Sequence, residues 1–448
     1  MPLRRRAIPP RSEDTGLPSP ISVKEQQARR PHVYELDPLR AVTAWSVVAV
    51  HVLAGTVLLN QSNVGVEVQN ALVVAMHFTR EVFIFVTAFA LVYVYYGKPF
   101  ATRRFGARRS IGVLLPYCIW SVVYVWVNGA GQSPATFLKT ATIDILTGNA
   151  SYQLYYILLT LQFYIILPLF LLFLKRVAHH PWKVLSISFV IQVVLYYADY
   201  RWLQQGTVAS SGFWQIVAGF QDRFVLVYQF YFVLGGFTAL YFQQIRSFLL
   251  RYGWFVACGM VAALAVLWLH FVLQIRVYQE SIGYATSVLQ PVMVFYSLAV
   301  ILFALWLACR WASHRYREGR PRGHRIWRVL SDASFGVYLI HVLLLTAILK
   351  WVVPAMPTAW PVAIRVILTW LMTVGSATTV SVTLLHIPVL SRLVGREHSV
   401  RREALQQAGE EKPGQRPQQA ETIPSTRLVE QVIQRGTFAQ ERSEVGNG

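Results

Sequence analysis

Charged residues and cysteines are both scarce in this 448-residue chain, and acidic residues are the rarer charged type. Only 14% of the residues are charged, against about 25% in an ordinary soluble domain, which argues against a soluble globular protein. The three cysteines show no CxxC or Cys–His spacing, so the sequence supports neither a disulfide framework nor a metal site such as zinc. With 21 acidic against 41 basic residues the net charge is +20. The basic residues are spread between apolar runs and form no single basic domain, which argues against nucleic acid as a partner.

Long apolar runs are what the chain has in excess, and hydrophobic residues make up 55% of it. A helix needs roughly 20 mostly apolar residues to cross a bilayer. The sequence therefore predicts an all-α, polytopic membrane protein with about ten transmembrane helices in contact with membrane lipids. The ten spans are expected near residues 41–59, 71–96, 111–128, 153–174, 184–198, 223–243, 253–275, 285–309, 333–353 and 361–386.

The loops between these spans predict the orientation. Loops after even-numbered spans carry 17 Lys and Arg, and loops after odd-numbered spans carry four. Basic loops stay in the cytoplasm, so we expect a multi-pass protein of the cell (plasma) membrane with both termini cytoplasmic. Residues 1–38 are predicted to be a polar, disordered arm, residues 39–388 a ten-span membrane domain, and residues 389–448 a disordered cytoplasmic tail, because this polar composition buries too little apolar surface to fold alone.

Two ionisable residues of the first span are candidate functional groups. Arg40 lies at its cytoplasmic end and His51 follows eleven residues later, which is roughly 16 Å along a helix and about mid-membrane. Ionisable groups in the hydrocarbon usually face a cavity, a partner or a pathway. A packing residue with its hydrogen bonds satisfied is the alternative for a lone histidine.

The second span brings three more such residues together in the stretch HFTRE. His77, Arg80 and Glu81 are spaced i, i+3 and i+4 and would share one face of a helix. By depth, Glu81 is expected opposite His51, where a carboxylate could orient the imidazole and stabilise its protonated form. The alternative is a structural network in which Arg80 and Glu81 neutralise each other or their neighbours.

Two further features complete the candidate site. His341, in the ninth span, is also expected near mid-membrane. The loop KPFATRRFGARR, which contains Arg104 and Arg108, carries five positive charges beside the third span. Such a loop suits the phosphates of an anionic cytoplasmic ligand and suits anionic lipid headgroups equally well.

Four segments in order resemble the integral-membrane acyltransferase 3 family. LDPLRAVTAWSVVAVH resembles the family's opening, in which a basic residue is followed by ten others and a histidine, here Arg40 and His51. EVFIFVTAFALVY, TRRFGARRSIGVLLPYCIWS and SFGVYLIH resemble its second-span, basic-loop and near-C-terminal stretches. The family's Arg-x-x-Arg is here Arg104 and Arg108, which are four residues apart. HFTREVFIFVTA is similar to the branch that includes the membrane protein for synthesis and export of poly-N-acetylglucosamine intercellular adhesin.

This resemblance implies an acyltransferase that transfers groups other than amino-acyl groups. The donor substrate would be acyl-CoA, either acetyl-CoA or succinyl-CoA, and the acceptor a hydroxyl of a cell-envelope polysaccharide, a related glycan or a lipid-linked saccharide, with other glycan-synthesis machinery as possible partners. His51 would be the general base, and Arg40, Arg80, His77, Arg104, Arg108 and His341 would bind donor or acceptor. The position of Glu81 in its span, rather than the resemblance, makes it the expected orienting partner of His51. Two other functions fit buried ionisable residues: a glycan exporter or flippase without acyl transfer, and a structural subunit of a glycan-synthesis complex.

Overall fold

Helices make up nearly all of the chain that the computed structural model describes, which is residues 31–129, 133–204, 212–314, 316–317 and 320–395. Within these ranges the only strands are two residues long, β1 (Tyr316–Arg317) and β2 (Arg320–Pro321), which pair antiparallel. Most of the predicted N-terminal arm and C-terminal tail, residues 1–30 and 396–448, lies outside the described residues.

Nine helical segments in the described ranges are long and apolar enough to cross a membrane, and a pair of helices bent by 43° makes a possible tenth. The nine are α2 (Leu36–Thr56) with η1 (Val57–Leu59); α3 (Asn63–Met76) with α4 (Thr79–Tyr95); α5 (Thr102–Arg109) with η2 (Ser110–Leu114) and α6 (Leu115–Asn128); α8 (Tyr155–Val177); α9 (Pro181–Ala198) with η3 (Asp199–Gln204); α12 (Phe242–Arg276); α14 (Pro291–His314); α15 (His324–Ala347) with η7 (Ile348–Val352) and η8 (Val353–Ala355); and α16 (Val362–His386). The bent pair is α10 (Gly212–Phe220) with η5 (Gln221–Arg223), followed by η6 (Val225–Tyr228) with α11 (Gln229–Leu240). The predicted all-α class with about ten spans is confirmed.

Three shorter helices were not predicted from the sequence: α7 (Pro134–Thr147), α13 (Ile282–Ala285) and η9 (Leu390–Val394). α7 lies between the third and fourth spans and packs against α6. It begins at Ser133, whose side chain accepts a hydrogen bond from the backbone of Thr136, and it ends at Gly148 with a φ of 76°. A Cβ at Gly148 would lie 2.8 Å from the Cα of Tyr155, so both the backbone conformation and the space favour glycine.

η9 extends the membrane domain past the predicted boundary at residue 388. It packs against α6, α15 and α16, and the indole of Trp120 donates a hydrogen bond to the carbonyl of Leu393 at 3.1 Å. The chain is therefore held to the helices up to the end of the described residues.

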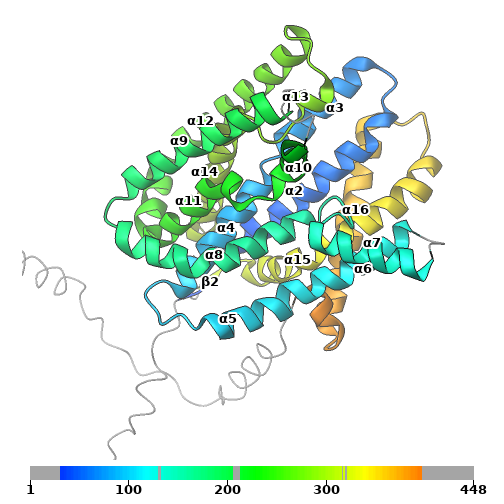
Figure 1. Cartoon of the computed structure of the whole chain (residues 1–448). Coiled ribbons are helices and arrows are strands. Elements are labelled where there is room, and N and C mark those ends of the chain that lie inside the picture. The colour runs from blue at the N-terminus through cyan, green and yellow to red at the C-terminus, as the bar shows by residue number, and fades with distance from the viewer. Residues whose placement is uncertain (1–30, 130–132, 205–211, 315, 318–319, 396–448) are drawn as a thin grey trace, which may run out of the picture. The chain divides into compact units, whose positions relative to one another are not determined.

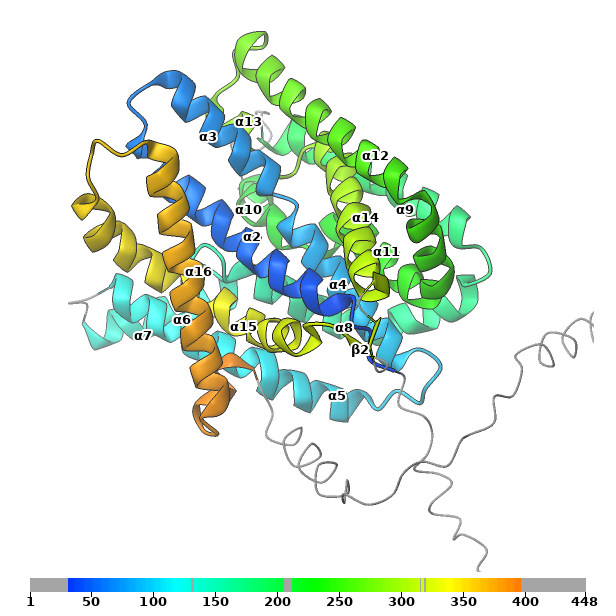
Figure 2. The same cartoon turned by 180° about the vertical axis from the view of Figure 1, so that it is seen from behind.

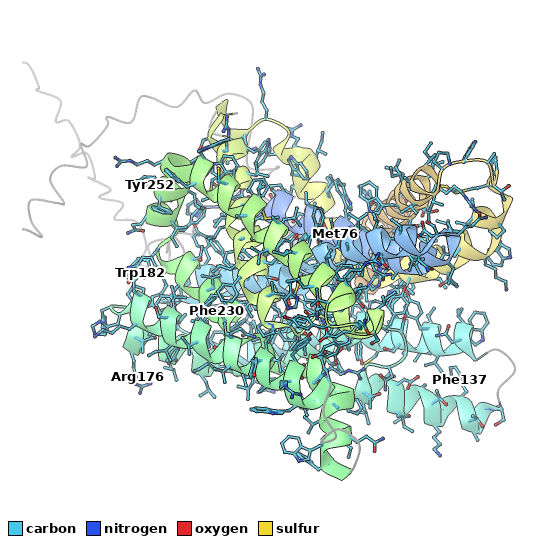
Figure 3. All side chains as sticks on the ribbon, turned by 90° about the horizontal axis from the view of Figure 1, so that it is seen from above. Met76, Phe137, Arg176, Trp182, Phe230 and Tyr252 are labelled. Carbon is cyan, nitrogen blue, oxygen red and sulfur yellow. The ribbon has the colours of Figure 1, made fainter. Side chains whose placement is uncertain are left out.

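The helices form two main groups, each around its own apolar core. One core contains side chains of α4, α8, α11, α12 and α14, and the other contains side chains of α6, α15 and the segment before α8. α2 packs against α4 of the first group and against α15 and α16 of the second (Figures 1 and 2). Figure 3 shows the α6–α7 pair, with Phe137 labelled, apart from the helices that carry Trp182 and Phe230.

Close approach of α4 and α11 depends on a small residue. A Cβ at Gly235 of α11 would clash with the carbonyl oxygen of Phe85 on α4, and small residues allow such backbone approach in membrane proteins.

Large apolar side chains cover the outside of the bundle, for example Ile165 at 77% and Trp254 at 75% exposure. An apolar outer surface is what a lipid-facing helix requires.

Candidate active site

Two histidines from α2 and α15 lie against each other. The rings of His51 and His341 stack with centroids 5.3 Å apart and an interplanar angle of 25°. Tyr152 also contacts His51, with ring centroids 4.6 Å apart. The sequence places both histidines near the middle of their spans, and the packing of α2 against α15 brings them together. Because ionisable groups inside a membrane domain are costly, this pair is a candidate chemical centre.

The hydrogen bonds of His341 determine which ring nitrogen is available. Nδ1 lies 2.8 Å from the carbonyl oxygen of Tyr338 and 3.2 Å from that of Val337. A carbonyl oxygen only accepts, so Nδ1 donates, and in the neutral ring Nε2 carries the lone pair. Nε2 is buried and has no hydrogen-bond partner among the described residues. A buried acceptor of this kind is ready for a hydroxyl from a substrate or a water.

The segment 148–155, which runs from the end of α7 to the first residue of α8, connects the histidine pair to the other group of helices. Its Tyr152 contacts His51, and the carbonyl of Gln153 accepts a hydrogen bond from the hydroxyl of Tyr338 on α15. Its Tyr155 hydroxyl accepts a hydrogen bond from Arg80. Sequence reasoning missed this segment, and the clustered tyrosines of ASYQLYY were the available signal.

Arg80, at the start of α4, has hydrogen bonds to one of its two terminal nitrogens only. Its Nη1 donates to the hydroxyls of Tyr155 at 2.9 Å and Tyr228 at 3.1 Å, and its guanidinium carbon lies 5.8 Å from the ring centroid of Tyr228. Its Nη2 is buried without a hydrogen-bond partner among the described residues. Nη2 is therefore the part of the guanidinium that the described residues leave without a hydrogen bond.

His77 stands where α3 ends and α4 has not yet begun. Its Nδ1 is buried and lacks a hydrogen-bond partner in the described ranges. His77, Arg80 and His341 are all close enough to His51 to act on its charge. The structure thus brings four of the predicted residues to one place: His51, His77, Arg80 and His341.

The predicted contact between Glu81 and His51 is wrong. Glu81 is fully buried, but its Oε1 accepts a hydrogen bond from Tyr196 of α9 at 3.4 Å, and its Oε2 has no partner among the described residues. The equal depth of Glu81 and His51 was the basis of the prediction, and depth does not determine direction. The helix is interrupted at His77, and successive residues of a helix are about 100° apart, so Glu81 turns away from the side on which Arg80 meets Tyr155.

Arg40 lies in a second polar group, at the other end of its helix from η1. The charges of Asp37, Asp332 and Arg109 and the hydroxyl of Tyr164 act on it. Among the described residues, no hydrogen bond or ion pair to the Arg40 guanidinium is found. Arg109, which was not among the predicted site residues, lies with its guanidinium 4.7 Å from the ring centroid of Tyr164.

Arg104 and Arg108 are both exposed on α5. They are four residues apart and therefore on the same side of the helix. α5 packs against α8, which also carries Tyr164, so these arginines belong to the same end of the bundle as Arg40. The structure keeps them apart from the histidine pair.

Other charged residues of the spans have local partners. Arg223 pairs with Asp222 at 3.5 Å and donates to Asn149 at 2.8 Å. Arg365 is 9% exposed and donates from Nη2 to the carbonyl of Val353 at 3.3 Å. No group of three or more metal-ligating side chains occurs in the ranges that the structure describes.

Comparison with known proteins assigns the family. The family model described as "Acyltransferase domain", of the acyltransferase 3 type, matches residues 33–386. The chain belongs to the acyltransferase 3 family. Searches of curated proteins and of solved structures gave no match. Arg40, His51, Arg80 and His341 all lie within the matched residues. The family match and the long apolar helices together make this chain a multi-pass membrane protein of an acyltransferase family.

Proposed function

We propose that the protein transfers an acyl group, acetyl or succinyl, from acyl-CoA to a hydroxyl of a cell-envelope glycan. The observation that carries this proposal is the stacked pair of His51 and His341, with Arg40 eleven residues from His51 on the same helix. A single helix thereby connects a basic surface to an imidazole, over roughly 16 Å. That arrangement suits a reaction whose donor has an anionic body and a distant reactive end.

The donor would approach from the end of the bundle that carries α5. The positive-inside bias of the loops favours the cytoplasm for this end and for both termini, and the cell membrane as the location. Arg40, Arg104 and Arg108 would bind the phosphates of acyl-CoA, since guanidinium groups suit phosphate oxygens.

The reaction requires movement of one proton. The acceptor hydroxyl attacks the thioester carbonyl carbon while His51 takes the hydroxyl proton; the new C–O bond forms, the C–S bond then breaks, and the proton passes to the leaving thiolate of CoA. The free Nε2 of His341 would accept a hydrogen bond from the acceptor and hold it in place, and the unpartnered Nδ1 of His77 would contact the donor or acceptor.

A glycan as the acceptor rests on the resemblance of HFTREVFIFVTA to the poly-N-acetylglucosamine adhesin branch. A polysaccharide or a lipid-linked saccharide would meet the site from the opposite end of the bundle to the donor. Other components of glycan synthesis would then be natural partners.

The test is transfer of label from acetyl-CoA or succinyl-CoA to an envelope-glycan fraction by purified protein in detergent. We expect His51→Ala to lose about 10²- to 10⁴-fold in rate, the usual contribution of a general base. The matched control is His386→Ala, at the exposed end of α16, which should retain activity. Full activity of folded His51→Ala would refute the mechanism, and glycan movement across vesicles without any acyl-CoA would favour an exporter.

A further inference from the structure

Arg80 is a partly buried cation whose Nη2 is fully buried, and it has no ion-pair partner among the described residues. Among the residues that the structure describes, no carboxylate lies within ion-pairing distance of its guanidinium. The neighbouring Glu81 acts on it electrostatically but directs its Oε1 to Tyr196. A charge in the interior of a membrane domain is costly unless something compensates it, and two tyrosine hydroxyls compensate it only in part.

The orientation of the guanidinium is fixed. Nη1 is held by hydroxyls from two different elements, Tyr155 on α8 and Tyr228 on η6. Because the guanidinium is planar, fixing Nη1 also fixes the direction in which Nη2 presents its N–H bonds. Nη2 is thus a preorganised donor that is buried and has no partner in the described ranges.

Arg80 is linked to the proposed base through two tyrosines of the segment 148–155. Its charge acts on His51, and Tyr155, which binds its Nη1, is three residues from Tyr152, which contacts the His51 ring. A carbonyl group attacked beside His51 would therefore have a positively charged N–H donor nearby.

We propose that Nη2 of Arg80 binds the carbonyl oxygen of the acyl group and stabilises the oxyanion that forms there. This inference rests on the proposed function and adds the group that would stabilise the negative charge of the transition state. When the acceptor oxygen bonds to the carbonyl carbon, the C=O electron pair moves onto the oxygen, which then carries a full negative charge. When the C–S bond breaks, that pair returns to re-form C=O and the sulfur leaves with the C–S pair. Arg80 exchanges no proton in either step.

A preorganised cationic donor stabilises this charge strongly because it needs no reorganisation during the reaction. It acts on the transition state more than on the bound donor, so its loss should appear in kcat rather than in KM. Loss of an arginine with a purely structural role would not affect kcat selectively.

The experiment combines kinetics with the infrared spectrum of bound donor. Acetyl-CoA and succinyl-CoA carrying carbon-13 at the thioester carbonyl are bound to the full-length protein in detergent without acceptor. We expect the wild-type protein to lower the carbonyl stretching frequency, as polarisation by Arg80 requires. In Arg80→Gln the band should return toward its position in free donor, with donor affinity changed less than about threefold and kcat lower by about 10²- to 10³-fold.

Two further variants keep the proposal falsifiable. Tyr228→Phe removes one of the two hydroxyls on Nη1 and should move the band part of the way back, with a loss of about tenfold in kcat. Arg365→Gln removes another largely buried arginine with a carbonyl partner and should leave the band unchanged.

The outcomes separate this inference from the proposed function. An unchanged low-frequency band in folded Arg80→Gln, or in Tyr228→Phe if the first variant does not fold, would overturn the role of Arg80 while leaving acyl transfer intact. Failure of wild-type protein to bind either donor would refute the proposed function itself, and the inference with it.

Discussion

Adjacent residues on α4 belong to two different polar regions. Arg80 points to Tyr155 and Tyr228, beside the stacked pair of His51 and His341. Glu81 turns to Tyr196 on α9, in a region that also contains the buried hydroxyl of Tyr231. We name these the histidine region and the Glu81 region. In the histidine region, Nη2 of Arg80 and Nε2 of His341 lack hydrogen-bond partners among the described residues. In the Glu81 region, tyrosine side chains surround a carboxylate. Equal depth in a membrane therefore says little about shared function.

The sharpest test of the difference is the double variant Arg80→Gln/Glu81→Gln. If the two residues serve separate regions, kcat should stay at the level of Arg80→Gln, about 10²- to 10³-fold below wild type. The unfolding temperature should be no lower than that of either single variant, because no uncompensated buried charge is left. Recovery of kcat to within about threefold of wild type would instead show that the pair only neutralises charge.

Within the histidine region, His341→Phe removes the Nε2 acceptor while keeping a flat ring against His51. The KM for the acceptor should rise about fivefold, since a neutral hydrogen bond contributes about 1 kcal/mol net. The KM for acyl-CoA should not change. Initial rates at varied acceptor and varied donor concentration separate the two constants.

His341→Gln is the matched control, because its amide oxygen can still accept a hydrogen bond. It should recover part of the acceptor affinity. A change confined to the donor KM would place His341 on the donor instead.

In the Glu81 region, Glu81→Gln should change kcat by less than about twofold. The carboxyl contacts Tyr196 and not His51, and an amide can occupy the same space. Replacing the carboxylate that orients a catalytic imidazole costs about 10⁴-fold in a Ser-His-Asp triad. A loss of even about 10²-fold in a well-folded variant would therefore restore Glu81 as the orienting partner of His51, and the steady-state transfer rate measures this directly.

The sequence predicts the spans well because a bilayer imposes one simple requirement, an apolar run of sufficient length. All ten predicted spans have helical counterparts, and the sixth, near 223–243, is the bent pair α10–η5 and η6–α11. α7 escaped prediction because its 14 residues mix Thr, Lys and Asp with apolar residues and are too short to span.

The site is predicted in part. Motif spacing and depth identify Arg40, His51 and His341 as candidates, but they cannot give rotation about a helix axis. The Glu81 hypothesis rested on depth, and depth does not determine the direction of a side chain: Glu81 contacts Tyr196 instead. Tyr155 and Tyr228 contact Arg80 from elements far apart in the sequence, and only tertiary packing reveals such partners.

The segment 148–155 contacts both the histidine pair and the helix that carries Arg80. It starts at Gly148, whose left-handed backbone and contact with Tyr155 leave little room for a side chain. Within eight residues it contacts α2 through Tyr152, α15 through Gln153 and α4 through Tyr155. A substitution that displaced this segment would change the contacts of the His51 ring and of Arg80 together, because the same eight residues hold both.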